Sequence, residues 1–290
     1  MILQFITWNV NPEILPVGPL SIRWYGLLFA ASFLFGYLIL QKVFKREGVS
    51  QEVLDRLTVY MAIGTIVGAR LGHVIFYDPV YYFSNPIRIL KIWEGGLASH
   101  GAAIGILIAL YLFAKKSKKS FLWTMDRIVI VVALAGFFIR TGNLMNSEIY
   151  GVETHLPWGF IFVRRGEMVP KHPTQIYEAL SYLAIFFLLY WLYRRRTDKI
   201  KEGYLFSIFL VLVFTARFLI EFIKEVQSPW EANLPLDMGQ ILSIPFVIAG
   251  IILFFNARKR DVPVIPAEIL QKEKNPKPAG KGSSNKKKKK

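Results

Sequence analysis

The sequence of 290 residues contains no cysteine, and it has only 20 acidic residues against 36 lysines and arginines. Without cysteine the chain forms no disulfide, no thiolate metal site and no cysteine nucleophile, so a thiol in its chemistry must come from a substrate. Long polar stretches are scarce, since 53% of the residues are hydrophobic and the mean hydropathy is +0.38. The apolar residues form long blocks, which excludes a disordered or fibrous protein and favours a chain embedded in lipid.

Blocks of about 20 apolar residues, the length that crosses a bilayer as a helix, occur repeatedly along the chain. The first block does not have the form of a removable signal peptide, because residues 1–19 contain no lysine or arginine. The sequence therefore predicts an all-α, polytopic membrane protein with seven transmembrane helices over residues 20–41, 53–77, 97–114, 121–139, 174–193, 203–223 and 238–256.

The basic residues divide unequally between the two ends of these spans. Three connections and the C-terminal tail on one side hold 24 lysines and arginines, whereas the connections on the other side hold six. Cytoplasmic loops of membrane proteins carry the excess of positive charge. We therefore expect the N-terminus outside and the C-terminus in the cytoplasm.

Two segments differ in composition from the spans. The longest outer connection, about residues 140–173, is rich in glycine and proline and predicts a small external head domain inserted between the fourth and fifth spans of a catalytic domain over residues 1–256. The basic tail, residues 257–290, is predicted to be disordered and either to be simply solvated or to touch anionic lipid headgroups. The tail holds 12 of the 36 basic residues, so the net charge of +16 does not indicate nucleic-acid binding.

Six arginines fall within or at the ends of the predicted spans. A central arginine costs at least about 3 kcal/mol on insertion, so each needs a partner, a route to the interface or a function. Two lie near cytoplasmic ends and are predicted to extend to the lipid surface, and a third lies near an outer end. The two near cytoplasmic ends are Arg56 and Arg127, and the one near an outer end is Arg23. The other three are Arg70, Arg140 and Arg217.

The last three arginines lie in the outer halves or ends of their spans. Arg70 shares a helical face with His73 and Tyr77. Arg217 lies four residues before Glu221, so a purely structural ion pair is one explanation of that position. Arg140 opens a polar run that continues through Glu148, and further polar residues occur at a similar depth, namely His100, Gln175, Glu178, Gln240 and Ser243.

This shared depth predicts a polar cavity in the outer half of the bundle. Two glycine-flanked amides at membrane depth are costly unless they contact a polar ligand. Arginine matches phosphate in two-point contact and keeps its charge when desolvated. The pattern therefore favours recognition of a phospholipid headgroup, and it leaves open whether the lipid is substrate or solvent.

At these residues the chain resembles the bacterial prolipoprotein diacylglyceryl transferases, over nearly all of residues 1–256. Residues 140–151, RTGNLMNSEIYG, are similar to the family pattern R-x-G-N-x-x-N-x-E-x-x-G at every fixed position. Where the family usually has H-G-G, this chain has Ala102 after His100 and Gly101, a methyl group that narrows a helix contact or an acyl-chain route. Further matches are residues 23–26, 68–72, 94–96, 172–178, 217–222 and 239–245.

The resemblance implies a fold, a reaction and its partners. The expected reaction moves the diacylglyceryl group of phosphatidylglycerol to the thiol of a lipobox cysteine in a prolipoprotein signal peptide, and it releases glycerol 1-phosphate. The expected location is the bacterial plasma membrane, where membrane lipids are the other partners. No cofactor, metal or nucleic acid is expected.

The resemblance also supports roles for individual residues. Arg140 and Arg217 are predicted to clamp the phosphate, because fixed cations near a developing anion often provide the largest catalytic term. His100 is predicted to act as general base, with orientation of the lipid glycerol as the alternative. The other predicted substrate-binding residues are Asn143, Asn146, Glu148, Gly151, Tyr25, Gly96, Glu221, Arg70 and Gln175.

Simpler explanations exist for some of these positions. Tyr25 is also explained as an aromatic residue at the membrane interface, and Gln175 with Glu178 as a packing network that fixes the head. A secondary transporter would also place charged residues inside its helices, but it predicts paired repeats and polar residues at the midplane. A retinal-binding receptor is disfavoured because residues 238–256 contain no lysine.

Overall fold

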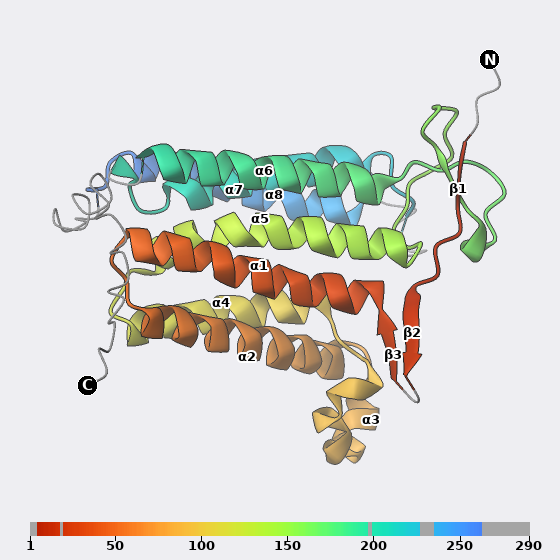
Figure 1. Ribbon diagram of the computed structural model, residues 1–290, viewed down its shortest axis with the longest axis horizontal. Coiled ribbons are helices and arrows are strands. Elements are labelled where there is room, and N and C mark those ends of the chain that lie inside the picture. Colours follow the sequence, from red (N-terminus) through yellow and green to blue (C-terminus); the bar gives the residue numbers. More distant parts are fainter. Residues whose placement is uncertain (1–4, 18–19, 197–198, 227–234, 263–290) are drawn as a thin grey trace, which may run out of the picture.

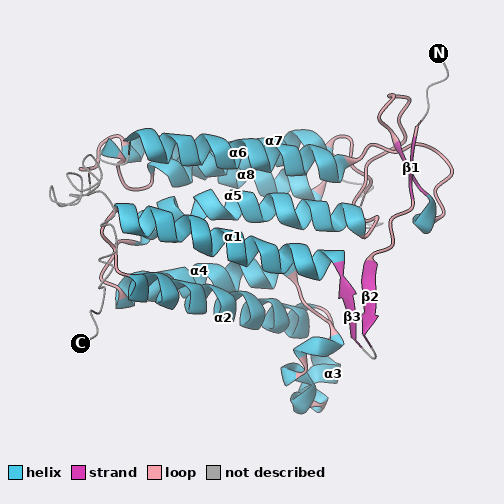
Figure 2. Cartoon of the chain, viewed as in Figure 1, coloured by secondary structure: helices cyan, strands magenta, loops and turns pink. Residues whose placement is uncertain are grey.

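The computed structural model describes residues 5–17, 20–196, 199–226 and 235–262, and this part of the chain is mostly helical (Figure 1, Figure 2). The long helices lie side by side along the longest axis of the molecule (Figure 1). One end of this bundle holds the short strands and the head (Figure 2). The long helices are α1 (Trp24–Arg46), α2 (Gln51–Phe76), α4 (Ser99–Lys116), α5 (Phe121–Met145), α6 (Thr174–Arg196), α7 (Tyr204–Glu221) and α8 (Met238–Ala257).

Six of these helices, α1, α2, α5, α6, α7 and α8, are long and apolar enough to cross a membrane. The chain is therefore a polytopic membrane protein. The expected third span is α4, which is not among the six. Its 18 residues begin with Ser99 and His100 and end with Lys115 and Lys116, so polar residues at both ends shorten its apolar part.

The expectation of an all-α fold is wrong in detail, because four short strands are present. β1 (Ile6–Trp8) pairs in parallel with β4 (Phe160–Phe162) of the head. β2 (Glu13–Val17) and β3 (Leu20–Arg23) form an antiparallel pair, so residues 20–23 are a strand and the first long helix begins only at Trp24. The parallel partner of β1 lies about 150 positions away in sequence, and a local apolar pattern does not reveal such pairing.

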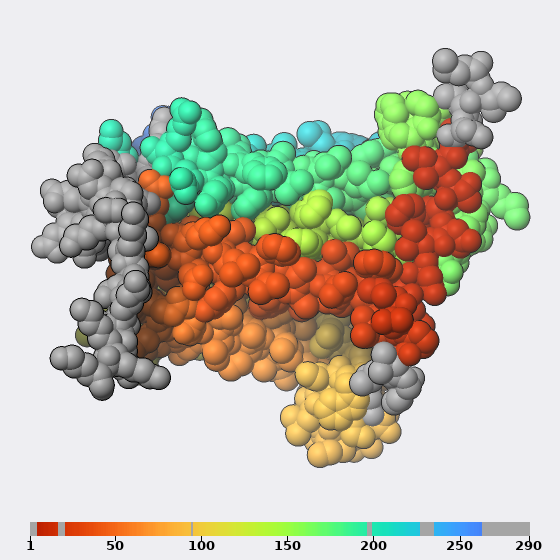
Figure 3. All heavy atoms as spheres, viewed as in Figure 1, coloured from red at the N-terminus to blue at the C-terminus, as the bar shows by residue number. Residues whose placement is uncertain are grey.

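The outer connections also differ from the expectation. α5 continues to Met145, so the first part of the predicted head is the last turns of a helix, and the head itself lies between α5 and α6. Between α2 and α4 the chain forms an arm of short helices, which protrudes from the bundle in the space-filling view (Figure 3). The arm consists of α3 (Pro79–Ser84), η1 (Pro86–Leu90) and η2 (Ile92–Glu94).

The prediction that Arg127 extends to the lipid surface is wrong. Its side chain is only 4% exposed and forms an ion pair with Glu47 at 3.0 Å, near the end of the bundle opposite the head. The surrounding core contains Phe44, Leu54, Trp123, Leu189 and Tyr193. α8 ends at Ala257, and residues 263–290 of the basic tail lie outside the described residues, so its predicted disorder remains a prediction.

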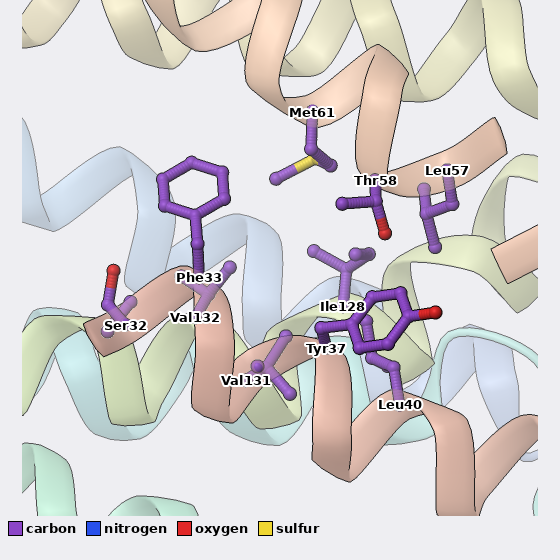
Figure 4. A pocket seen from close by; sticks show the side chains of 12 residues that line it. Ser32, Phe33, Tyr37, Leu40, Leu57, Thr58, Met61, Ile128, Val131 and Val132 are labelled. Carbon is purple, nitrogen blue, oxygen red and sulfur yellow. The ribbon is translucent and has the colours of Figure 1, made fainter. Parts of the chain in front are cut away.

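α2 and α4 pack against each other through glycine. A Cβ atom added at Gly68 would lie 2.5 Å from the carbonyl oxygen of Gly101, and one at Gly105 would lie 2.2 Å from that of Gly64. The two backbones therefore touch, as small residues permit in membrane helices. Between α2 and the helices α1 and α5, by contrast, a cavity of about 90 Å³ remains, lined by side chains such as Phe33, Tyr37 and Met61 (Figure 4).

Candidate functional site

The polar residues of the outer half converge because of the alternating direction of the helices. The C-terminal ends of α5 and α7 and the N-terminal ends of α6 and α8 meet at the end of the bundle that carries the head (Figure 1). This arrangement brings together residues from four helices that are far apart in sequence. Most of the predicted site residues, from Tyr25 to Glu221, lie in this cluster.

Arg140 forms the centre of the cluster. Its Nε lies 2.9 Å from Oε2 of the fully buried Glu178, and its NH1 group donates to Oδ1 of Asn143 at 3.3 Å. Its guanidinium also hydrogen-bonds with the side chain of Tyr182. These contacts hold Arg140 in place. Its side chain is still 15% exposed, so a ligand can reach it.

A tight turn after α5 directs Glu148 back toward the helix end. Ser147 and Ile149 have φ angles of 52° and 62°, a left-handed conformation that is unfavourable for residues other than glycine. As a result, Oε1 of Glu148 accepts hydrogen bonds from Nδ2 of Asn143 at 2.8 Å and of Asn146 at 3.2 Å. The strained turn therefore forms a connected set of amide and carboxylate groups beside Arg140.

Two more predicted residues support this turn. Gln175 is buried, and its Nε2 donates to the backbone carbonyl of Glu148 at 2.7 Å. The ring of Tyr25 lies against Gly142, since a Cβ atom at that glycine would be 2.8 Å from Cδ2 of the ring. Tyr25 thus contacts the site, although its predicted role toward the substrate is not tested by these contacts.

A chain of buried ion pairs continues from Arg140 toward α7. Lys224 Nζ lies 3.2 Å from Oε1 of Glu178 and 3.0 Å from Oε2 of Glu221, and its side chain is only 4% exposed. Glu221 in turn packs on Gly239 of α8, where a Cβ atom would lie 2.3 Å from the carboxylate carbon. Lys224 is one of the six basic residues of the predicted outer connections, and its spacing of three residues from Glu221 was a usable signal for this ion pair.

Arg217 differs from the other cations of the cluster. The ion pair expected between Arg217 and Glu221 is absent from the described residues, because Glu221 pairs with Lys224 instead. The Nε atom of Arg217 is buried and has no hydrogen-bond partner among them. Arg217 does interact electrostatically with Tyr182, the residue that also contacts Arg140. The two arginines therefore both interact with one tyrosine, and the Nε donor of Arg217 is available to a ligand.

Gly151 joins the head to the end of α7. A Cβ atom at this position would lie 2.2 Å from the carbonyl oxygen of Ile223, and its N–H donates to His172 at 2.8 Å. Gly151 also forms an isolated β-bridge with Lys224. Gly151 thus allows two protein backbones to approach closely beside Lys224, and its predicted contact with the substrate stays a prediction.

Arg70 and Gly96 lie at a different place, where the arm meets α2. Arg70 is buried and donates through Nε, NH1 and NH2 to four backbone carbonyls of the arm and the segment after it, including those of Ile89 at 2.9 Å and Gly96 at 3.1 Å. A side chain at Gly96 would meet His73 at 2.7 Å. In this structure Arg70 stabilises the base of the arm, and its predicted substrate contact stays a prediction.

His100 is also separate from the arginine cluster in the interactions of the described residues. It is exposed at the beginning of α4, and its ring packs against Phe76 at 5.4 Å and Tyr77 at 5.9 Å between centroids. Tyr77 stacks in turn on His73 at 5.2 Å. The structure therefore groups the face of α2 predicted from sequence, His73 and Tyr77, with His100.

A second group of polar residues lies outside the spans and joins the head to the segment after α7. Lys171 Nζ contacts Glu225 at 2.5 Å and Glu167 at 3.5 Å, and these carboxylates raise the pKa of Lys171, chiefly through the hydrogen bond to Glu225. Burial and the hydrogen bond to Glu167 raise the pKa of Tyr150 to about 12. Burial lowers the pKa of His172. The tyrosine and the lysine therefore remain protonated near neutral pH.

A comparison with known proteins identifies the family of this chain. The family model described as prolipoprotein diacylglyceryl transferase matches residues 12–256, which include every residue of the arginine cluster. The chain belongs to this family. The match begins at Pro12 and ends at Asn256, so it leaves out the whole basic tail.

Curated proteins named phosphatidylglycerol--prolipoprotein diacylglyceryl transferase are similar to this transferase along nearly their whole length. The protein of Tolumonas auensis is 51% identical over 253 residues, covering 87% of this chain and 97% of the relative. That of Porphyromonas gingivalis is 48% identical over 273 residues, covering 89% and 96%. That of Chloroherpeton thalassium is 44% identical over 258 residues, again covering 89% and 96%.

Proposed function

We propose that this transferase moves the diacylglyceryl group of phosphatidylglycerol to the thiol of a lipobox cysteine in a prolipoprotein. The cysteine sulfur attacks the terminal glyceryl carbon, so that a carbon–sulfur bond forms as the carbon–oxygen bond to phosphate breaks. The bonding electrons leave with glycerol 1-phosphate, and the thiol proton passes to a base. The chain supplies no cysteine of its own, in agreement with a nucleophile that belongs to the substrate.

The single observation that carries this proposal is the pair of arginines on either side of Tyr182. Arg140 is oriented by Glu178 and Asn143, and Arg217 keeps a buried Nε without a partner. A phosphate between them would receive the missing hydrogen bonds and would gain negative charge as the glyceryl carbon leaves. Fixed donors directed at charge that develops in the transition state contribute about 3–4 kcal/mol each.

His100 is our candidate for the base that receives the thiol proton. An unperturbed cysteine is only a few per cent thiolate at neutral pH, and imidazole suits proton transfer in this range. Positioning of the lipid glycerol is the alternative role. A His100→Gln variant whose rate recovers at high pH supports the base, and a loss that does not change with pH supports positioning.

The proposal includes a topology. With α4 added to the six membrane-spanning helices, the chain would cross the bacterial plasma membrane seven times, with the N-terminus and the head outside. The lysines of the connections at the opposite end, and of the tail, would then lie in the cytoplasm, as the positive-inside rule requires. The arginine cluster would lie at the depth of the outer headgroups.

The deciding experiment incubates the purified protein with phosphatidylglycerol and a lipobox peptide. Mass spectrometry should find the peptide with a diacylglyceryl thioether and an equal amount of glycerol 1-phosphate. A peptide with serine in place of the cysteine is the matched control and should remain unmodified. If the protein is folded, and lipid and peptide are intact, absence of the thioether disproves the proposed reaction.

A further inference from the structure

A long apolar groove on the α2–α4 pair has no part in the reaction as described above. Its volume is about 630 Å³, and its side chains are apolar apart from the hydroxyl of Tyr60. The lining residues are well exposed, for example Ile63 at 58%, Val67 at 48% and Ile104 at 54%. Since α2 is one of the membrane-spanning helices, the groove would open toward the lipid tails.

The glycine contact explains why the groove exists. Gly64, Gly68 and Gly72 of α2 face Gly101 and Gly105 of α4, and each lacks the side chain that would otherwise fill the space between the helices. A third helix packs best on small residues, but the contact between α2 and α4 already uses these. Larger side chains, most of them branched, line the rims, so the groove suits a narrow, flexible chain better than a helix.

At its outer end the groove adjoins polar rings that are not among its lining residues. Phe76 lines it there, and its ring packs edge-on against His100 at 5.4 Å. Tyr77 stacks on the same histidine, with His73 behind it. An apolar trough that ends at imidazole and phenol groups matches an amphiphile, with its acyl chain along the helices and its glycerol ester at the outer surface.

We infer that this groove holds one acyl chain of the diacylglyceryl donor lipid, with the glycerol end at His100. This inference rests on the proposed function and adds the location of a lipid tail. Ile104, Ile108 and Leu112 lie about 6, 12 and 18 Å along α4 from His100. A tail within one leaflet spans about 15 Å, half of the hydrocarbon core, so it passes Ile104 and Ile108 and reaches Leu112 only if it is long.

A tryptophan scan along α4 tests whether tails of different length reach different positions in the groove. The substrates are phosphatidylglycerols with dioctanoyl, dimyristoyl and dioleoyl tails, each assayed with the lipobox peptide. We expect Ile104→Trp to raise KM about tenfold for every lipid, the loss expected when about two methylenes leave the groove. Leu112→Trp should raise KM for the dioleoyl lipid alone. Ile252→Trp, on α8 and at a side chain 56% exposed, is the matched control and should change none of the values.

A photoreactive lipid gives a second measurement that does not depend on turnover. Phosphatidylglycerol with a diazirine near the end of one tail should crosslink to residues of α2 and α4, and unlabelled phosphatidylglycerol should compete better than phosphatidylcholine. Equal competition by both lipids, or crosslinks spread evenly over α7 and α8, would mean surface lipid only and would overturn the inference. Occupation of the groove by a second copy of the chain or by the peptide helix would overturn it too.

The two proposals fail in different ways. If the wild-type protein makes no thioether but the crosslinks map to the groove, the proposed reaction falls and the lipid site stands. If the thioether forms but Ile104→Trp leaves every KM unchanged, or Leu112→Trp changes KM equally for all tail lengths, the reaction stands and the groove does not hold the lipid tail.

Discussion

Two arginines at opposite ends of the helix bundle, the buried Arg127 and the partly buried Arg217, differ in how their donors are used. Arg127 donates through Nε and NH2 to Glu47 and through NH1 to the carbonyl of Trp123, and its guanidinium stacks on the Trp123 ring at 4.5 Å. Arg217, at the head end, keeps a buried Nε with no hydrogen-bond partner in the described part of the chain.

The difference separates structural charge from charge that is available to a ligand. A buried ion pair with all its hydrogen bonds made joins helices, and Glu47 also accepts from the hydroxyl of Tyr193, so this site links α1, α5 and α6. An unpaired buried donor is costly unless a ligand pays that cost. An arginine whose three nitrogens all donate within the protein, as in Arg127, is a poor phosphate site, and one with an unpaired buried donor is a better candidate.

The largest expected effect comes from breaking the structural site. Arg127→Ala should lower the free energy of unfolding by about 3–5 kcal/mol, because it leaves the carboxylate of Glu47 buried without its partner. Thermal unfolding in detergent measures the loss. The double variant Arg127→Met with Glu47→Leu removes both charges and should recover most of the stability. A single variant as stable as the wild type would show that Arg127 does not support the bundle.

The opposite result is expected at the head end. Arg140→Lys and Arg217→Lys each keep a positive charge but lose the planar two-point contact with phosphate. Turnover should fall by about 10²–10³, while the midpoint of thermal unfolding stays near that of the wild type. The thioether assay and thermal unfolding are measured on the same preparation. A lysine variant with normal turnover would remove that arginine from the proposed phosphate clamp.

A smaller effect is expected at Asp126, next to Arg127. Its carboxylate accepts from the backbone N–H of Gly203 at 2.7 Å and of Phe206 at 2.8 Å, and so caps the beginning of α7. Asp126→Asn retains only one acceptor oxygen, so the variant should lose about 1–2 kcal/mol of stability. Its KM for phosphatidylglycerol should not change. A selective change in that KM, with stability unchanged, would contradict this separation of the two ends.

The smallest effect should come from Tyr182, which contacts both arginines of the head end. Tyr182→Phe removes the hydroxyl and should reduce turnover about tenfold, near the lower end of the range for one hydrogen bond to a charged group. Tyr190→Phe, on the same helix but in the apolar core, is the control and should behave as the wild type. Equal effects of the two variants would mean that the hydroxyl of Tyr182 does not position the arginines.

The strength of the sequence predictions depended on whether the evidence was local. The polar run from Arg140 to Glu148 lies on consecutive turns, so a local cluster could be foreseen, and in the structure Asn143 contacts both Arg140 and Glu148. Glu178 was foreseen only as part of a packing network, and Lys224 was not singled out. Their ion pairs join α5, α6 and the end of α7, and no pattern within one helix reports contacts across three.

The sequence by itself determined the apolar segments, the end of the bundle at which polar groups gather and the family of the chain, because these depend on composition and on the order of short motifs. Only the tertiary structure decided which arginine has its donors satisfied. In the structure Arg127 pairs with Glu47, and Glu221, the possible partner of Arg217, pairs with Lys224 instead. Arg70 donates to backbone carbonyls. Hydrogen-bond satisfaction is a property of three-dimensional neighbours, and helical spacing predicts those only along a single helix.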